Sequence, residues 1–268
     1  MSDRGRRPPT FADACEAVLS NPGDDHAAET TLAPVHARSI PDGWAERRKR
    51  LVASRFSADV DRVLELGCGV GALLRELGTE YDVVGVDSRR EYLRFPAARG
   101  AAVVRGDPTR PPVRPVFDSV CAVEDVASNV PPVDLCVAAY GALRPGGIFV
   151  VAAPTDPTAV LDSGVDTYSG SRYLLERAVD VASDGVVTID YRISDRRTGK
   201  TAVTTEKRTV DTTSADGLTA ALRTAGFENV LVAGESDLPG IVVGTGVRPV
   251  DTGDPADVGT SGPPVLDE

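Results

Sequence analysis

Short apolar runs alternate with amphipathic segments through the middle of the chain. Runs rich in valine, alanine and leucine have the length of single strands and lie at 62–66, 82–86, 101–104, 117–122 and 147–152. Closely spaced leucines predict a short helix soon after the first run, and residues 131–142 predict another helix. Short continuous strands separated by helices are typical of a parallel sheet covered on both faces. The pattern therefore predicts an α/β protein with a doubly wound sheet.

The regions on either side of this alternation have patterns of their own. Before it, Asp42 is in position to cap a helix that reaches Phe56. After it, residues 186–193 and 201–210 flank a turn and predict an antiparallel hairpin. This hairpin separates the apolar strands from the last part of the chain.

The last part of the chain predicts one helix and two strands. Thr213 and Asp216 form a capping-box pattern at the start of the helix, and Gly226 ends it. Strands are expected near 228–233 and 240–246, where they would complete the sheet.

Composition predicts where the folded domain begins and ends and in which compartment the protein lies. Residues 1–12 and 249–268 are polar and rich in proline or glycine, so we expect disordered tails, the second of them acidic. No run approaches the roughly 20 apolar residues that span a bilayer. The arginines near the start are not followed by an apolar segment, so no secretory signal is expected. We therefore expect a cytoplasmic protein without a membrane segment.

The charge and the cysteines exclude several classes of function. The net charge is −11, which repels phosphate backbones and makes a nucleic-acid partner unlikely. Only three of the 29 basic residues are lysines, a bias typical of a halophile or of a GC-rich genome. The cysteines (Cys15, Cys68, Cys121 and Cys136) are irregularly spaced and only two histidines accompany them, so we expect neither a metal site nor disulfides.

The most informative segment is a glycine-rich turn after the first strand. Gly67, Gly69 and Gly71 follow the strand directly and open a helix, so a ligand can approach the backbone there. Gly67, Gly69 and Ala72 also satisfy the dinucleotide fingerprint, and a tight turn without any ligand has the same sequence. The turn by itself does not choose among these readings.

Three acidic positions favour a cationic ligand. Glu65 lies inside the apolar strand just before the turn, where a carboxylate is costly unless a cation or a hydrogen-bond donor meets it. Asp87 ends the second strand, where a carboxylate can accept both hydroxyls of a ribose, although it also suits an ordinary helix cap. Gly106 and Asp107 close the third strand, in position for an adenine amine or for a simple Asp-Pro turn.

At these positions the chain resembles the class I S-adenosylmethionine-dependent methyltransferases. The similar segments are ELGCGVG from Glu65, GVD ending at Asp87, GD at 106–107, the strand start at 117–118, LRPGG at 143–147 and AGF at 225–227. The resemblance covers residues 40–248 and implies one domain over 13–248, with a seven-stranded sheet whose last strand is antiparallel and a small antiparallel cap at 155–210. It implies S-adenosyl-L-methionine as cofactor, bound by Glu65, Gly67, Cys68, Gly69, Gly71, Asp87, Ser88, Gly106 and Asp107.

The acceptor side is less clear in the sequence. Glu124 and Asp125 follow the fourth strand and are weak candidates for a general base, as is Tyr191 in the expected cap. Both histidines lie in the poorly patterned stretch before residue 42 and are not expected at the site. The Asn/Asp-Pro-Pro-Tyr signature of some family members is absent after the fourth strand, which lowers the expectation of base or glutamine methylation. We therefore expect methyl transfer to an oxygen or nitrogen of a small molecule.

The same motifs suit three other classes of function. A relative that binds the cofactor without transferring methyl would have the same motifs, because no catalytic base is evident. A tRNA or protein methyltransferase would need a basic groove, which the composition does not indicate. A nicotinamide-dependent oxidoreductase would need a hydride-site base such as a Tyr-x-x-x-Lys pair, and the sequence has none.

Overall fold

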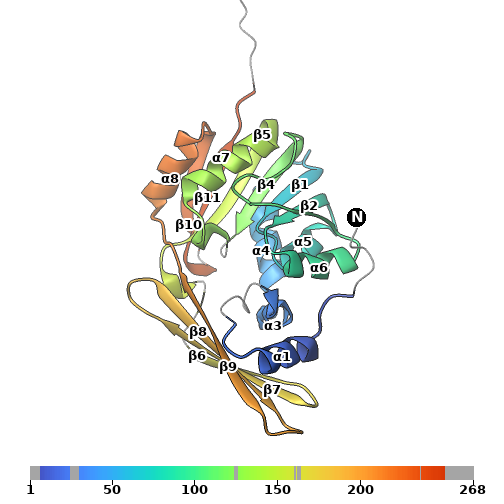
Figure 1. The fold of residues 1–268 in the computed structure, drawn as a ribbon. Helices are drawn as coiled ribbons and strands as arrows, with labels where there is room; N and C mark the ends of the chain where they lie inside the picture. The colour runs from blue at the N-terminus through green and yellow to red at the C-terminus, as the bar shows by residue number, and fades with distance from the viewer. Residues whose placement is uncertain are drawn as a thin grey trace, which may run out of the picture.

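The computed structural model places a seven-stranded sheet above a separate four-stranded sheet (Figure 1). It describes residues 7–24, 30–123, 126–159, 161, 164–235 and 237–250. Before the first strand, the described residues include the helices α1 (Phe11–Ser20), α3 (Ala33–Ser39) and α4 (Trp44–Ala53). Helices α1 and α3 lie beside the four-stranded sheet, and α4 lies behind the larger one (Figure 1).

The seven-stranded sheet confirms the predicted fold class. Its strands lie in the order β10-β11-β5-β4-β1-β2-β3. Strand β11 pairs antiparallel with both β10 and β5, whereas the pairs within β5-β4-β1-β2-β3 are parallel. Their bounds are β1 Arg62–Leu66, β2 Asp82–Asp87, β3 Ala102–Arg105, β4 Phe117–Val123, β5 Leu143–Pro154, β10 Glu228–Glu235 and β11 Leu238–Val247.

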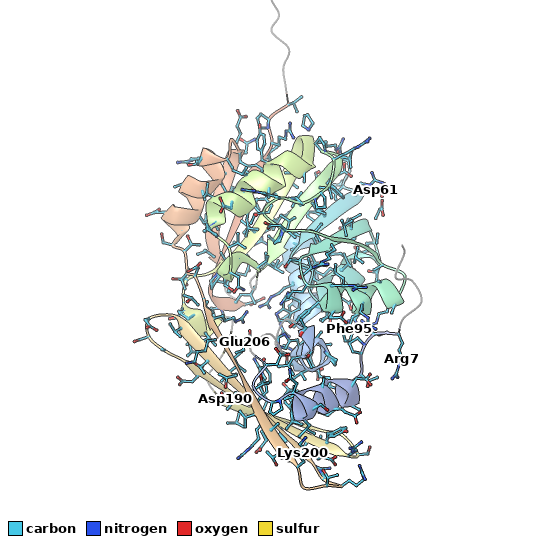
Figure 2. The ribbon with its side chains drawn as sticks, viewed as in Figure 1. Arg7, Asp61, Phe95, Asp190, Lys200 and Glu206 are labelled. Atoms are coloured by element: carbon cyan, nitrogen blue, oxygen red, sulfur yellow. The ribbon has the colours of Figure 1, made fainter. Side chains whose placement is uncertain are left out.

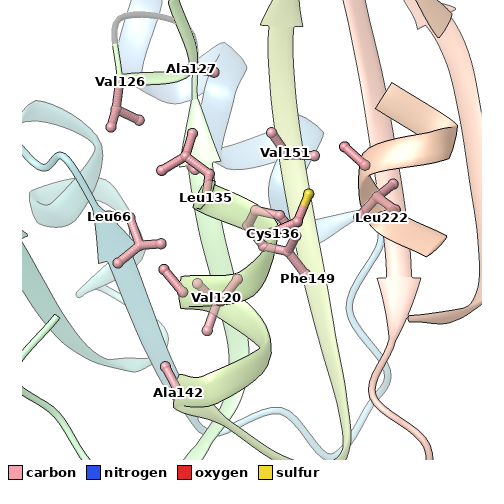
Figure 3. Close-up of a cluster of buried hydrophobic side chains, with 14 of the residues drawn as sticks. Leu66, Val120, Val126, Ala127, Leu135, Cys136, Ala142, Phe149, Val151 and Leu222 are labelled. Carbon is pink, nitrogen blue, oxygen red and sulfur yellow. The ribbon is translucent and has the colours of Figure 1, made fainter. Parts of the chain in front are cut away.

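Helices cover both faces of this sheet, as continuous apolar strands require. Alternate residues of β1 enter two separate cores: Leu64 and Leu66 pack on one side and Val63 on the other. The first core includes α7 (Pro132–Ala142) and α8 (Ala215–Thr224), and Figure 3 shows Leu135, Phe149 and Leu222 within it. The second core includes α4 and α5 (Ala72–Leu77). Helix α6 (Arg90–Ala98) and the short 3-10 turns η1 (Val126–Ser128) and η2 (Pro157–Ala159) complete the layers.

The four-stranded sheet, called the cap sheet below, is larger than the predicted hairpin. Its strands are β6 (Gly164–Ser169), β7 (Tyr173–Val181), β8 (Val186–Asp195) and β9 (Thr201–Thr209), all antiparallel in chain order. The sequence predicts β8 and β9 but misses β6 and β7. Strand β7 alternates buried and half-buried positions, but Arg177 occupies one of the buried positions and interrupts the apolar pattern.

The amino-terminal boundary predicted at residue 12 is wrong. Helix α1 already includes Phe11 and Ala12, because Thr10 and Asp13 form a capping box at its start. Phe11 is buried in the core that α1 shares with the cap sheet, beneath the guanidinium of Arg38. Regular structure is therefore present at positions that composition assigns to a tail.

Two predicted helix caps also differ in the structure. Ser214, not Thr213, caps α8 by accepting a hydrogen bond from the Gly217 N–H. Helix α4 begins after Gly43 in the left-handed region and has no side-chain cap, so Asp42 does not serve as one. Across the described ranges, the structure contains no helix that combines the length and the apolar character needed to cross a membrane.

Candidate active site

A cavity of about 230 Å³ lies between the glycine turn after β1 and the cap sheet. One wall consists of Glu65 and the turn from Gly67 to Gly69, and the opposite wall includes Tyr191 and Glu206 of the cap sheet. Figure 2 shows Glu206 on the side of the cap sheet that faces the larger sheet. The cavity therefore lies at the carboxyl end of β1, where open α/β sheets bind ligands.

The glycine turn offers little to a phosphate. The N–H groups of Gly67 and Cys68 both donate to the Val86 carbonyl, at 2.8 and 3.0 Å. The Gly69 N–H donates to an Asp87 carboxylate oxygen at 2.9 Å. A pyrophosphate site needs backbone N–H groups that point at the ligand. The turn thus disfavours the dinucleotide interpretation of its glycines.

Gly69 is the glycine of the turn that leaves room beside the backbone. Its φ is +53°, and a Cβ added there would meet its nearest neighbour, an Arg89 nitrogen, only at 3.6 Å. At Gly67 the same construction reaches Val126 at 2.4 Å, so the missing side chain serves internal packing. The turn therefore combines a tight internal fit with one open position.

Glu65 is a buried carboxylate that faces this cavity. It is 3% exposed, and its Oε2 has no hydrogen-bond partner among the described residues. Burial, and secondarily the negative charge of Asp87, raises the pKa of Glu65 to about 8. A buried carboxylate without a partner is unfavourable, and a cationic ligand would relieve the cost. Glu65 thus fits a ligand that carries positive charge near the turn.

Asp87 is brought next to the turn, but its carboxylate is already engaged. Besides the Gly69 N–H, it accepts hydrogen bonds from the Arg89 backbone N–H at 2.9 Å and from Nε and Nη2 of Arg89, both at 3.0 Å. The Arg89 guanidinium also lies over the Tyr92 ring, 3.9 Å from its centroid. A ribose at Asp87 therefore has to compete with Arg89.

Three of the remaining predicted cofactor positions, Ser88, Gly106 and Asp107, lie farther along the same sheet edge. Across the described chain, the cavity wall does not extend to Ser88, Gly106 or Asp107. Asp107 is exposed, and its Oδ1 accepts hydrogen bonds from the N–H and the hydroxyl of Thr109, which lower its pKa. Gly106 packs closely against Pro112. Cys68 and Gly71 belong to the turn itself, and burial raises the pKa of the Cys68 thiol.

The residues predicted to act on the methyl acceptor differ in where the structure places them. Glu124 and Asp125 lie outside the described residues. Tyr191 is fully buried and lines the cavity, where its hydroxyl lies between His36 and Glu206. The expectation that the histidines lie away from the site is wrong for His36, because α3 carries it into the cavity wall.

No sequence pattern pointed directly to His36 or Glu206 as site residues. His36 is 155 residues from Tyr191, its hydrogen-bond partner, and only the fold brings them together. Glu206 shares the inner face of β9 with Ala202 and Thr204, but the alternation does not tell which face is inner until the strands are paired. Arg48, in the basic run of α4, is buried and stacks on Trp44 of the cavity wall, whereas Arg47 and Arg50 are exposed.

The described residues contain no group of three or more His, Cys, Asp or Glu side chains placed to hold a metal ion. The four cysteines are buried free thiols, and burial raises the pKa of each. The site is therefore built from carboxylates, hydroxyls, guanidinium groups and one imidazole.

Similar solved structures share the fold. The sugar N-methyltransferase KedS8 from Streptoalloteichus sp ATCC 53650 is 22% identical, with a TM-score of 0.63 over 80% of this chain and 91% of that one. DesVI from Streptomyces venezuelae is 20% identical, with a TM-score of 0.61 over 87% and 97%. CalS10 from Micromonospora echinaspora, an amino pentose methyltransferase solved with bound S-adenosylmethionine, is 21% identical, with a TM-score of 0.61 over 81% and 95%.

Comparison of sequences identifies the family. No curated protein matches this chain. A family model described as a methyltransferase domain matches residues 36–232, a range that begins at His36 and includes the glycine turn, Asp87 and the whole cap sheet. This confirms the resemblance seen in the motifs: the chain belongs to the methyltransferase domain family.

Proposed function

We propose that this protein transfers the methyl group of S-adenosylmethionine to an oxygen or nitrogen of a small molecule bound against the cap sheet. The observation that carries the proposal is Glu65, a buried carboxylate whose Oε2 has no hydrogen-bond partner among the described residues, in the wall of a cavity beside the glycine turn. S-adenosylmethionine presents an ammonium and a sulfonium, and both favour the ionised form of such a carboxylate. Membership of a methyltransferase family agrees with this choice of ligand.

Each part of the cofactor has candidate partners in this chain. Gly67, Cys68, Gly69 and Gly71 would lie along the methionine part, with Glu65 facing its positive charge. Asp87, with Ser88, would accept the ribose hydroxyls in place of Arg89, and Gly106 with Asp107 would lie at the adenine. When bound, the cofactor supplies an activated methyl group. The chain's own task is to align the acceptor with that methyl and to exclude water.

The acceptor is proposed to be a polar molecule such as an amino sugar. The cavity wall opposite the glycine turn contains His36, Tyr191, Glu206 and Arg208, which can hydrogen-bond hydroxyl and amino groups. KedS8 and CalS10 are described as a sugar N-methyltransferase and an amino pentose methyltransferase, so amino sugars are the first acceptors to test. We place the reaction in the reducing cytoplasm, because the four cysteines are free thiols.

Transfer of a labelled methyl group tests the proposal. Purified protein is incubated with trideuteromethyl S-adenosylmethionine and the small-molecule fraction of an extract of the cells that make it, and products are found by mass spectrometry. We expect at least one compound to gain a single trideuteromethyl group. Cofactor binding by calorimetry without any labelled product would contradict methyl transfer and support the non-catalytic alternative.

Replacing Asp87 by alanine tests the cofactor site. We expect the affinity for S-adenosylmethionine to fall at least roughly tenfold, because the ribose loses hydrogen bonds to a charged group. Isothermal calorimetry measures the change. Asp82→Ala is the matched control, since Asp82 begins the same strand, is exposed and pairs with Arg62. Equal affinities for both variants would show that the ribose does not lie at Asp87.

A further inference from the structure

A chain of hydrogen bonds crosses the cavity wall and joins four separate elements. The Tyr92 hydroxyl lies 2.5 Å from His36 Nδ1, and His36 Nε2 lies 3.0 Å from the Tyr191 hydroxyl. The Tyr191 hydroxyl in turn donates to Glu206 Oε2 at 3.1 Å. These side chains come from α6, α3, β8 and β9, and all of them line the cavity. The cofactor proposal assigns none of them a role.

The carboxylate at the end of this chain occupies an unusual position. Strand β9 alternates, and its inner positions run from Ala202 through Thr204 to Glu206. The Glu206 side chain is 17% exposed on a face that elsewhere packs against an apolar core. A half-buried carboxylate on such a face is costly. Its presence there indicates a function rather than packing.

The two oxygens of Glu206 differ in their surroundings. Oε2 accepts a hydrogen bond from the Tyr191 hydroxyl, whereas Oε1 lies 4.0 Å from Arg208 Nε, beyond hydrogen-bond distance. Because the single hydroxyl hydrogen of Tyr191 is donated to Glu206, the Tyr191 oxygen must accept a hydrogen bond from His36 Nε2. In neutral His36, Nδ1 then accepts the hydrogen of Tyr92. Each donor in this series of hydrogen bonds therefore points toward Glu206. The series ends at Oε2, so Oε1 is left to bind a molecule in the cavity.

We propose that Glu206 Oε1 accepts the proton that the acceptor loses during methyl transfer, an assignment that rests on the proposed function. The acceptor's oxygen or nitrogen forms a bond to the methyl carbon, and the carbon–sulfur bond breaks with its electron pair remaining on sulfur. The proton leaves the acceptor for Oε1, so that Glu206 becomes a neutral carboxylic acid and the cofactor product is uncharged at sulfur. Tyr191 and His36 are positioning residues that hold the carboxylate through Oε2.

Other groups in the cavity are less suited to this step. Glu65 lies beside the glycine turn and is assigned to the cofactor's positive charge. His36 has both ring nitrogens in hydrogen bonds, and the Tyr191 hydroxyl is held between His36 and Glu206. Besides Glu206 and the groups already named, the cavity is lined by the charged side chains of Arg89, Arg177 and Arg208 and by the Cys68 thiol.

Glu206→Gln tests the assignment, because glutamine keeps the size and the oxygen that accepts from Tyr191 but cannot take up a proton. Activity is measured as trideuteromethyl product formed from the small-molecule extract fraction described above. We expect kcat to fall at least roughly 100-fold, with the KM for the extract fraction and the Kd for S-adenosylmethionine changing less than about threefold. Glu176→Gln is the matched control, since Glu176 lies on the outer face of β7 in the same sheet. It should leave kcat unchanged.

Formate rescue separates proton acceptance from a structural role. In Glu206→Ala, added sodium formate should raise the rate at least about tenfold above sodium chloride of the same ionic strength, whereas wild type should not respond. Tyr191→Phe should lower kcat by about tenfold. Formate should not raise the rate of this variant, because the carboxylate of Glu206 is still present. A Glu206→Gln enzyme within threefold of the wild-type kcat, or a Glu206→Ala enzyme that formate does not rescue, would overturn the proposal. Absence of product from wild type would instead contradict the proposed function itself.

Discussion

Glutamine in place of Glu65 is expected to weaken the binding of S-adenosylmethionine by roughly 10- to 100-fold, because a hydrogen bond to a charged group contributes about 1.5–3 kcal/mol. In the free protein the pKa of Glu65 is raised to about 8, so the carboxyl is largely protonated at pH 7. A cationic ligand favours the ionised form, so binding at pH 7 should release close to one proton. Calorimetry in buffers of different ionisation enthalpy measures this release, which Glu65→Gln should abolish.

The same raised pKa makes the stability of the free protein depend on pH. The folded-state pKa of about 8 lies above the ordinary value of 4.5, so the folded state binds more protons between these values. The free energy of unfolding should therefore fall as the pH rises from about 4.5 to 8. Relative to wild type, Glu65→Gln should gain up to a few kcal/mol at pH 8 and little at pH 4.5.

Urea unfolding at pH 5 and pH 8 measures this difference. Glu228→Gln is the control, because Glu228 is exposed at the start of β10. If Glu65→Gln and the control show the same change between the two pH values, Glu65 is not the group whose ionisation limits stability.

Alanine at Gly67 is expected to destabilise the protein by about 2–5 kcal/mol, the sum of two separate costs. Its φ of +72° lies in the left-handed region, which costs an alanine roughly 1–2 kcal/mol. The added Cβ would also lie 2.4 Å from the Val126 Cβ, and relieving such an overlap costs roughly 1–3 kcal/mol more. The midpoint of urea unfolding measures the total.

Gly100→Ala isolates the first of these costs. Gly100 has a φ of +83°, and nothing lies within 4 Å of an added Cβ. We expect Gly67→Ala to lose clearly more stability than Gly100→Ala. Equal losses would show that the contact between the glycine turn and Val126 contributes nothing.

The sequence was sufficient where the chemistry is local. The strand 62–66 and the turn after it were predicted because apolar runs and glycines have short-range signatures, and β1 has the predicted bounds. Glu65 stood out because a carboxylate inside an apolar strand needs an explanation wherever the strand lies. Asp87 ends the second strand as predicted, but its pairing with Arg89 depends on side-chain conformation that the pattern does not contain.

The acceptor side could not be predicted because it depends on distant pairing. His36 reaches Tyr191 only after α3 packs on the cap sheet, and Glu206 reaches it only after β8 and β9 pair in a particular register. The strands β6 and β7 were missed because β7 places Arg177 on its buried face. Long-range contacts therefore determine the half of the cavity that periodicity does not reveal.

The core that α1 shares with the cap sheet has a consequence for how this chain folds during synthesis. Phe11, Val18 and Leu19 pack with Leu175 and Ile189, so the partners of the first helix leave the ribosome long after it does. Until then α1 lacks its partners in the cap sheet and has α3 beside it, whereas strands β1 to β5 can pair as they emerge. The nascent chain should therefore form the cofactor side of the cavity first and the acceptor side last. If the ribosome stalls before residue 173, α1 should remain accessible to chaperones.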